Sequence, residues 1–271
     1  MRRFITKVLS ISLALLVLSG CASKYGEPRT QPQYYPGCYR PIQDLRDREH
    51  SVGKSTAVGA GLGAASGALI GLLTTGKWQG ALMGAAVGGV GGTMVGNMYG
   101  RKQQMRDDNI RLNSYLQDLD GDISNLDVTG AAARTALQCY DRQFQGLLSA
   151  IRARQISREA AAARFREIQD GREEAIAILG NAAAYGENLN QQYEHAFASE
   201  QQQIQAPQKV SQNRAQYQRN AATLNAAKKR KQTLAHRAAA IRQERSVAQN
   251  TSSQQMQEIN QAMAELQEIH S

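Results

Sequence analysis

The sequence predicts an all-α protein in which a membrane-spanning helical hairpin is followed by long helices. Glycine recurs at every fourth position within residues 53–102, where two stretches of about 21 residues carry no charge. Apolar side chains recur at spacings of three and four through much of residues 103–271, which is the period of an amphipathic helix. The 271 residues include 24 glycines but only 4 Phe and 1 Trp, so an enzyme core would lack large side chains.

Residues 1–20 have the layout of a secretory signal peptide. Basic residues lie near the N-terminus, an uncharged run covers residues 8–18, and small residues precede Cys21. The alternative is a short anchor that stays attached, but this run is too short to cross about 30 Å of hydrocarbon. We therefore expect the segment to be removed.

The sequence Leu18-Ser19-Gly20-Cys21 resembles the bacterial lipobox. The resemblance implies cleavage before Cys21, a diacylglycerol thioether on its sulfur and an acylated amino terminus. Ala22 after the cysteine implies sorting to the outer membrane. We therefore expect a lipid-anchored outer-membrane protein that has no cofactor beyond the covalent diacylglycerol and acyl chain.

Two cysteines remain once Cys21 carries lipid. The periplasm is oxidising and favours disulfides, so Cys38 and Cys139 are candidates for a bridge. Two free, partly buried thiols are the alternative. The sequence leaves both open, because a bridge needs Cα atoms within about 7 Å.

Residues 21–52 read as a lipidated, Pro/Tyr-rich linker. Four prolines alternate with four tyrosines there, which favours an extended, polyproline-like spacer. A recognition strip for an aromatic-binding partner is the alternative. The residues are Pro28, Pro32, Pro36, Pro41, Tyr25, Tyr34, Tyr35 and Tyr39.

Residues 53–102 form a glycine zipper. Spacing by four aligns the glycines in one groove of a helix, where a second helix can approach closely. In water each glycine would cost about 1 kcal/mol relative to alanine, whereas in lipid a helix satisfies the backbone. Charged residues before, between and after the two uncharged stretches predict a hairpin with both ends on one side of the membrane. That side is expected to be the periplasm, because Cys21 would anchor in the periplasmic leaflet. The alternatives are a disordered Gly/Ala linker and a hairpin in the inner membrane. The packing glycines are Gly59, Gly63, Gly67, Gly71, Gly76, Gly80, Gly84, Gly88, Gly92, Gly96 and Gly100.

The lipobox followed by paired zippers is similar to the glycine-zipper two-helix outer-membrane lipoproteins, the SlyB and rickettsial surface-antigen group. The resemblance covers residues 18–102. It implies an oligomeric, lipid-associated envelope protein that supports outer-membrane integrity and has no known catalysis.

Residues 103–271 predict long periplasmic helices in a coiled coil or an antiparallel bundle. One seam runs through residues 112–126 and resumes at residues 137–151 after a break at Asp127–Gly130. Ser157 and Glu159 predict the start of a helix that continues toward Pro207. After this possible division we expect two more helices. The first would carry Val210, Tyr217, Leu224, Leu234 and Ile241, and the last Met256, Ile259, Met263 and Leu266.

A basic run lies at the centre of residues 209–245. Lys228, Lys229, Arg230 and Lys231 are consecutive there. A solvated helix face is one interpretation. The other is contact with anionic lipid, lipopolysaccharide or an acidic partner, where each charge contributes about 1 kcal/mol.

These patterns predict a structural protein and no enzyme. The four histidines have no metal-ligand spacing, and no catalytic or cofactor motif accompanies them. We expect membrane lipid and further copies of the chain as partners, with lipopolysaccharide or other envelope proteins as candidates, and neither nucleic acid nor a small-molecule substrate. The zipper would oligomerise in the membrane while the helices contact periplasmic partners and support the envelope. The alternatives are a scaffold in an envelope-spanning secretion or transfer machine and a pore-forming oligomer.

Overall fold

The computed structural model describes residues 25, 27–48, 108–205 and 214–268. These ranges contain a short helix at residues 36–48 and three long helices, α5 (Asp108–Arg152), α6 (Arg158–Ile204) and α8 (Arg214–Glu268). No strand occurs in them. The prediction of an all-α fold is therefore confirmed for the part of the chain that the structure describes.

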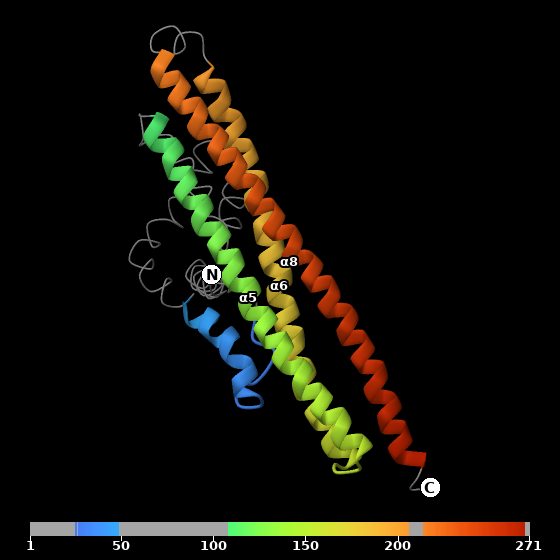
Figure 1. Cartoon of the computed structure of the whole chain (residues 1–271). Helices are drawn as coiled ribbons and strands as arrows, with labels where there is room; N and C mark the ends of the chain where they lie inside the picture. The colour runs from blue at the N-terminus through green and yellow to red at the C-terminus, as the bar shows by residue number, and fades with distance from the viewer. Residues whose placement is uncertain (1–24, 26, 49–107, 206–213, 269–271) are drawn as a thin grey trace, which may run out of the picture.

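The three long helices form an elongated antiparallel bundle. Figure 1 shows α5 and α8 running in one direction and α6 in the other, and each helix packs against the other two. Of the two predicted arrangements, the structure has the antiparallel bundle. Most of the predicted seam is buried, including Leu112, Leu119, Leu126, Tyr140, Phe144, Phe165, Ile168, Leu179, Tyr193, Phe197, Leu224, Leu234, Ile241 and Ile259.

The turn between α5 and α6 is closed by local backbone contacts. The amide of Gln155 donates to the carbonyl of Ala150 at 2.9 Å, and Arg154 adopts a left-handed φ of 57°, as is common where a helix ends. Ser157 then caps α6 by accepting a hydrogen bond from the amide of Ala160 at 3.3 Å. The helix start predicted at Ser157 is confirmed.

The predicted break at Asp127–Gly130 is wrong, because α5 continues through it. Thr129 and Gly130 are buried there. A Cβ added to Gly130 would lie 3.5 Å from the side chain of Ile241. The small residues that resembled a loop in the sequence are therefore a close contact between α5 and α8.

The prediction of two helices after Pro207 is also wrong, because α8 is continuous. Between Ile241 and Met256 its buried face is carried by Ala248 and Gln255, which are too small or too polar to extend an apolar seam. Met256, expected in that seam, is 42% exposed. Val210 lies outside the described residues, as does the side chain of Leu266.

The extended spacer predicted for residues 21–52 is wrong at residues 36–48, which are helical. Cys38, Ile42 and Leu45 recur at spacings of four and three and are buried against the bundle. Pro36 stands at the first helical position, where its missing N–H costs nothing. The prolines therefore mark the approach to a helix that packs on the bundle.

Several predictions concern residues that the structure does not describe. These are the signal peptide at residues 1–20, the lipid site at Cys21 and the zipper glycines between Gly59 and Gly100. Among the described residues, no helix combines the length and the apolar character needed to span a membrane.

Candidate functional site

The N-terminal strap, which we define as residues 25 and 27–48, is held on the bundle by Glu174 of α6. This carboxylate is 1% exposed. Its Oε2 accepts hydrogen bonds from the amides of Arg29 and Thr30 at 2.8 and 3.0 Å. Its Oε1 accepts from Arg46 Nε and Nη2 at 3.1 and 2.7 Å and from the Tyr39 hydroxyl at 3.4 Å. Both carboxylate oxygens are therefore satisfied by the strap, as a buried charge requires.

A disulfide fastens the same part of the strap to α5. The sulfurs of Cys38 and Cys139 are bonded, and their Cα atoms are 5.2 Å apart. The structure thus joins the two cysteines for which the sequence allowed either a bridge or two thiols. Next to the bond, the rings of Tyr35 and Tyr140 meet edge to face with centroids 6.1 Å apart. The strap is consequently held by a covalent bond on α5 and by a buried ion pair on α6.

Tyrosines around Glu174 remain uncharged at neutral pH. Burial raises the pKa of Tyr39, and the nearby Glu174 carboxylate adds to this effect. Burial also raises the pKa of Tyr140, and the Glu174 carboxylate is again the second cause. Tyr39 of the strap and Tyr140 of α5 are therefore neutral packing groups at the contact between the strap and the bundle.

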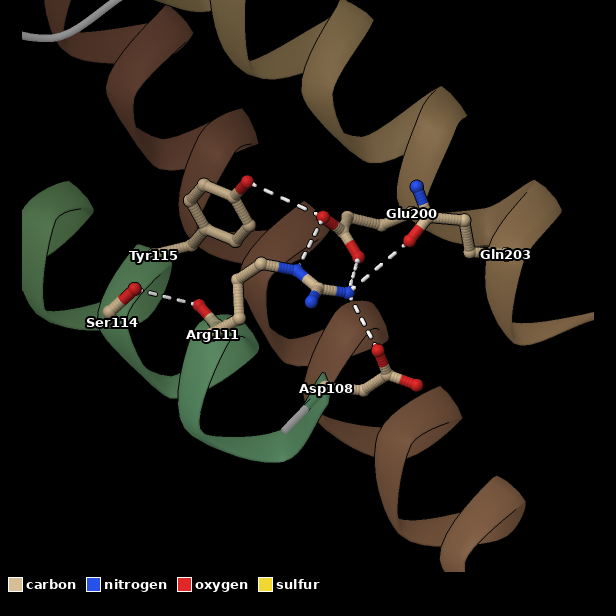
Figure 2. A network of polar contacts seen from close by, with 6 residues as sticks. All are labelled: Asp108, Arg111, Ser114, Tyr115, Glu200 and Gln203. Atoms are coloured by element: carbon tan, nitrogen blue, oxygen red, sulfur yellow. Dashed lines mark hydrogen bonds and ion pairs between the residues drawn. The ribbon is translucent and has the colours of Figure 1, made fainter. Parts of the chain in front are cut away.

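A second buried network fixes the start of α5 to the end of α6 (Figure 2). Arg111 donates from Nε and Nη2 to the two oxygens of Glu200 at 2.9 and 2.7 Å, and from Nη2 to Asp108 at 2.7 Å. The Tyr115 hydroxyl and Gln203 complete the network, each with a contact of 3.4 Å. Burial alone would lower the pKa of Arg111, but hydrogen bonds and charge from Glu200 and Asp108 outweigh it and raise the pKa. Arg111 therefore carries a permanent charge inside the bundle.

A third polar layer connects all three long helices. Arg172 of α6 is 1% exposed and forms an ion pair with Asp141 of α5. Gln255 of α8 donates to the same Asp141 oxygen at 3.0 Å. An open groove of about 370 Å³ lies beside this layer, and its lining includes Arg172, Leu137 and Val247. No group of His, Cys, Asp or Glu within the described residues could hold a metal ion.

The predicted basic run is largely paired within the bundle. Arg230 contacts Asp120 of α5 at 3.2 Å, and Lys231 forms an ion pair with Glu194 of α6. The ammonium of Lys228 donates to the side chain of Gln201 at 2.6 Å. Lys229 is exposed. Three of the four residues proposed for anionic contact thus bind neighbouring helices.

The sequence patterns did not predict the residues that carry these networks. Glu200 follows Phe197 by three and precedes Ile204 by four, so it occupies a seam position where an apolar residue is expected. Arg172 also occupies a seam position, because it follows Ile168 by four residues. Charged residues at seam positions were the available signal. Glu174 had no comparable signal, because its partners lie more than 100 residues away.

Comparison with known proteins identifies the N-terminal part of the chain. Residues 1–100 match the family described as YMGG-like Gly-zipper. The predicted glycine-zipper segment is therefore confirmed, and the match indicates a membrane-associated protein. No curated protein and no solved structure matches the chain. The chain therefore combines an N-terminal segment similar to this family with an all-α bundle in the residues that the structure describes.

Proposed function

We propose that this protein is a structural lipoprotein of the outer membrane. Its acyl anchor at Cys21 and its zipper hairpin enter the membrane, zippers from several copies pack together, and the bundle contacts periplasmic partners. In this way the protein supports the integrity of the envelope. Support comes from the glycine-zipper match, the lipobox-like Leu18 to Cys21 and a disulfide that suits an oxidising compartment.

One structural observation carries the proposal. The residues on both sides of the zipper are built into the same bundle, through Cys38 and Arg46 before it and through Arg111 after it. The two chain ends of residues 49–107 are therefore held by one rigid base. Such a base suits a hairpin that must be presented to a membrane.

Palmitate labelling with membrane fractionation tests the anchor. We expect label on the wild-type chain and its recovery in the outer-membrane fraction. The Cys21→Ala variant should lose the label. Label that persists in this variant would contradict a lipid on Cys21.

Cross-linking in intact membranes tests the packing of the zipper. Gly84→Leu and Gly88→Leu fill the predicted groove and should reduce cross-linked oligomers, because helices can no longer approach closely. Ala86→Leu lies between them and serves as the control. Equal cross-linking in all variants would contradict the role of the zipper. Ion conductance of the purified protein in planar bilayers would instead favour a pore.

A further inference from the structure

The strap enters the bundle halfway along its length, at Tyr25. Tyr25 is buried in the apolar core. Four residues later the amide of Arg29 donates to Glu174 of α6 at 2.8 Å, and Tyr25 itself interacts electrostatically with Tyr185 of the same helix. Tyr185 is 19 residues before the end of α6 and 27 residues after its start. At 1.5 Å per residue, Tyr25 therefore lies roughly 29 Å from the nearer end of α6 and roughly 40 Å from the other.

The chain between the lipid site and this point is short. Cys21 precedes Tyr25 by four residues, which span at most about 14 Å when fully extended. An upright bundle could place acyl chains from Cys21 in a membrane only if roughly 15 Å of its end entered the lipid. That end carries the exposed charged residues Arg214 and Arg219 at the start of α8, which are costly in hydrocarbon. An upright bundle is therefore incompatible with lipid on Cys21.

In the sequence the zipper lies between helix 36–48 and α5. Residues 53–102 are separated from Arg48 by four residues and from Asp108 by five, so both connections are short. Figure 1 shows helix 36–48 directed toward the end of the bundle at which α5 begins. The contacts of the strap with Cys139, Tyr140 and Glu174 are on α5 and α6, and Figure 1 shows α8 on the far side of α5 from helix 36–48.

The outer surface of the strap suits lipid headgroups. Its exposed charges balance, so it does not repel an anionic surface. Tyr34 is exposed in the turn before helix 36–48, and tyrosine favours the boundary between lipid and water. The exposed charged residues are Glu27, Asp44, Asp47, Arg29, Arg40 and Arg48.

We propose that the bundle lies along the membrane with the strap against the lipid headgroups and α8 facing away from them. This orientation rests on the proposed lipidation of Cys21. The bundle would then cover the membrane surface and would not project from it. Partners would then meet α8 and the groove lined by Leu137, Arg172 and Val247.

Energy transfer from single labels to labelled headgroups tests the orientation. The full lipidated chain is reconstituted in vesicles of phosphatidylethanolamine and phosphatidylglycerol that contain an acceptor lipid. Donors are attached in Gln43→Cys on the strap, Ser246→Cys on α8 and Gln155→Cys in the turn between α5 and α6. All three positions are exposed. The disulfide and the lipid thioether occupy the three native cysteines, so each variant has a single free thiol.

We expect the strongest transfer from Gln43→Cys and a clear loss at Ser246→Cys, because two helix layers separate that label from the headgroups by about 20 Å. Transfer from Gln155→Cys should remain measurable. Strongest transfer at Ser246→Cys would overturn the assignment of the membrane-facing side. Transfer confined to Gln43→Cys would mean that the turn stands far from the membrane and would overturn the flat orientation. Donor labelling of the wild-type chain would instead show that Cys21 is unmodified, which is a failure of the proposed lipid anchor.

Discussion

Arg134 of α5 and Glu244 of α8 form an ion pair at 2.6 Å whose charges are reversed relative to its two neighbours along the same helices. In each of the three pairs the partner on α8 follows the residue on α5 by 110 positions. Sliding α8 by one heptad would place Glu244 beside Asp127, and the opposite slide would place Arg237 beside Arg134. Either slide creates a like-charge contact, so the reversed pair specifies the register of α8. The other pairs are Asp120–Arg230 at 3.2 Å and Asp127–Arg237 at 3.1 Å.

Reversing one charge of this pair should destabilise the bundle, and reversing both should restore it. Arg134→Glu places two carboxylates together, and we expect a loss of about 0.5–1 kcal/mol because the pair is partly exposed. Arg134→Glu with Glu244→Arg should recover the stability in thermal unfolding followed by circular dichroism. A double variant as unstable as the single one would contradict the pairing. The double variant also removes the penalty for sliding, which distances between spin labels on α5 and α8 would reveal.

Glu174→Gln should release the strap while leaving the disulfide intact. It removes the charge that Arg46 faces in a buried site, and losing one partner of such a pair costs about 3 kcal/mol. We expect faster hydrogen exchange across residues 27–48. Glu173→Gln is the matched control, because its contact with Arg29 at 3.4 Å is exposed on both sides. Equal exchange in the two variants would show that Glu174 does not hold the strap.

Two helical glycines should respond to alanine in opposite ways. A Cβ at Gly171 would collide with the ring of Tyr140, so Gly171→Ala should lower the free energy of unfolding by about 1–3 kcal/mol. Gly146 has open space around its missing Cβ, and Gly146→Ala should raise stability by about 0.5–1 kcal/mol. Denaturant unfolding compares the two variants. A neutral effect of Gly171→Ala would mean that the contact between α5 and α6 is looser than in this structure.

Stability should fall at alkaline pH through the buried tyrosines. Burial is the first cause of the raised pKa of Tyr140 and of Tyr185, with Glu174 and Asp122 adding to it. Below pH 10, near the ordinary pKa of tyrosine, both phenols are neutral in the folded and the unfolded chain, and their contribution is fully present. Above pH 10 the unfolded chain loses these protons first, so the free energy of unfolding decreases as pH rises.

Denaturant unfolding at a series of alkaline pH values checks this expectation. Tyr185→Phe should flatten the alkaline decrease relative to the wild type. Tyr34→Phe, which removes an exposed phenol, is the control. A decrease of the same steepness in Tyr185→Phe and wild type would assign the effect to other groups.

The parts of the fold that the sequence predicted are those set by local rules. Ser157 starts α6 because its hydroxyl caps the adjacent backbone, and the seam through Tyr193 and Phe197 follows from helical spacing alone. The short helix at residues 36–48 could not be found in this way. Its apolar face is formed by only three residues, Cys38, Ile42 and Leu45, and it is buried only by packing on distant parts of the chain.

The candidate site depends on contacts that are distant in sequence. Arg46 meets Glu174 across 128 residues, and Arg111 meets Glu200 across 89. Single-sequence patterns carry the charge of these residues but not the identity of their partners. The cysteines were an exception, because their partners could be named from the sequence. Once Cys21 is assigned to lipid, Cys38 and Cys139 are the two cysteines that remain as candidates for a bridge.

The position of Glu174 imposes an order of events on synthesis. A chain that emerges N-terminus first presents Arg29 and Thr30 long before the carboxylate that receives their amides, which follows by 145 and 144 residues. The zipper lies between them and emerges earlier than α6. The strap must therefore wait unpaired while the glycine-rich segment is made, and α5 and α6, which are made later, complete its attachment.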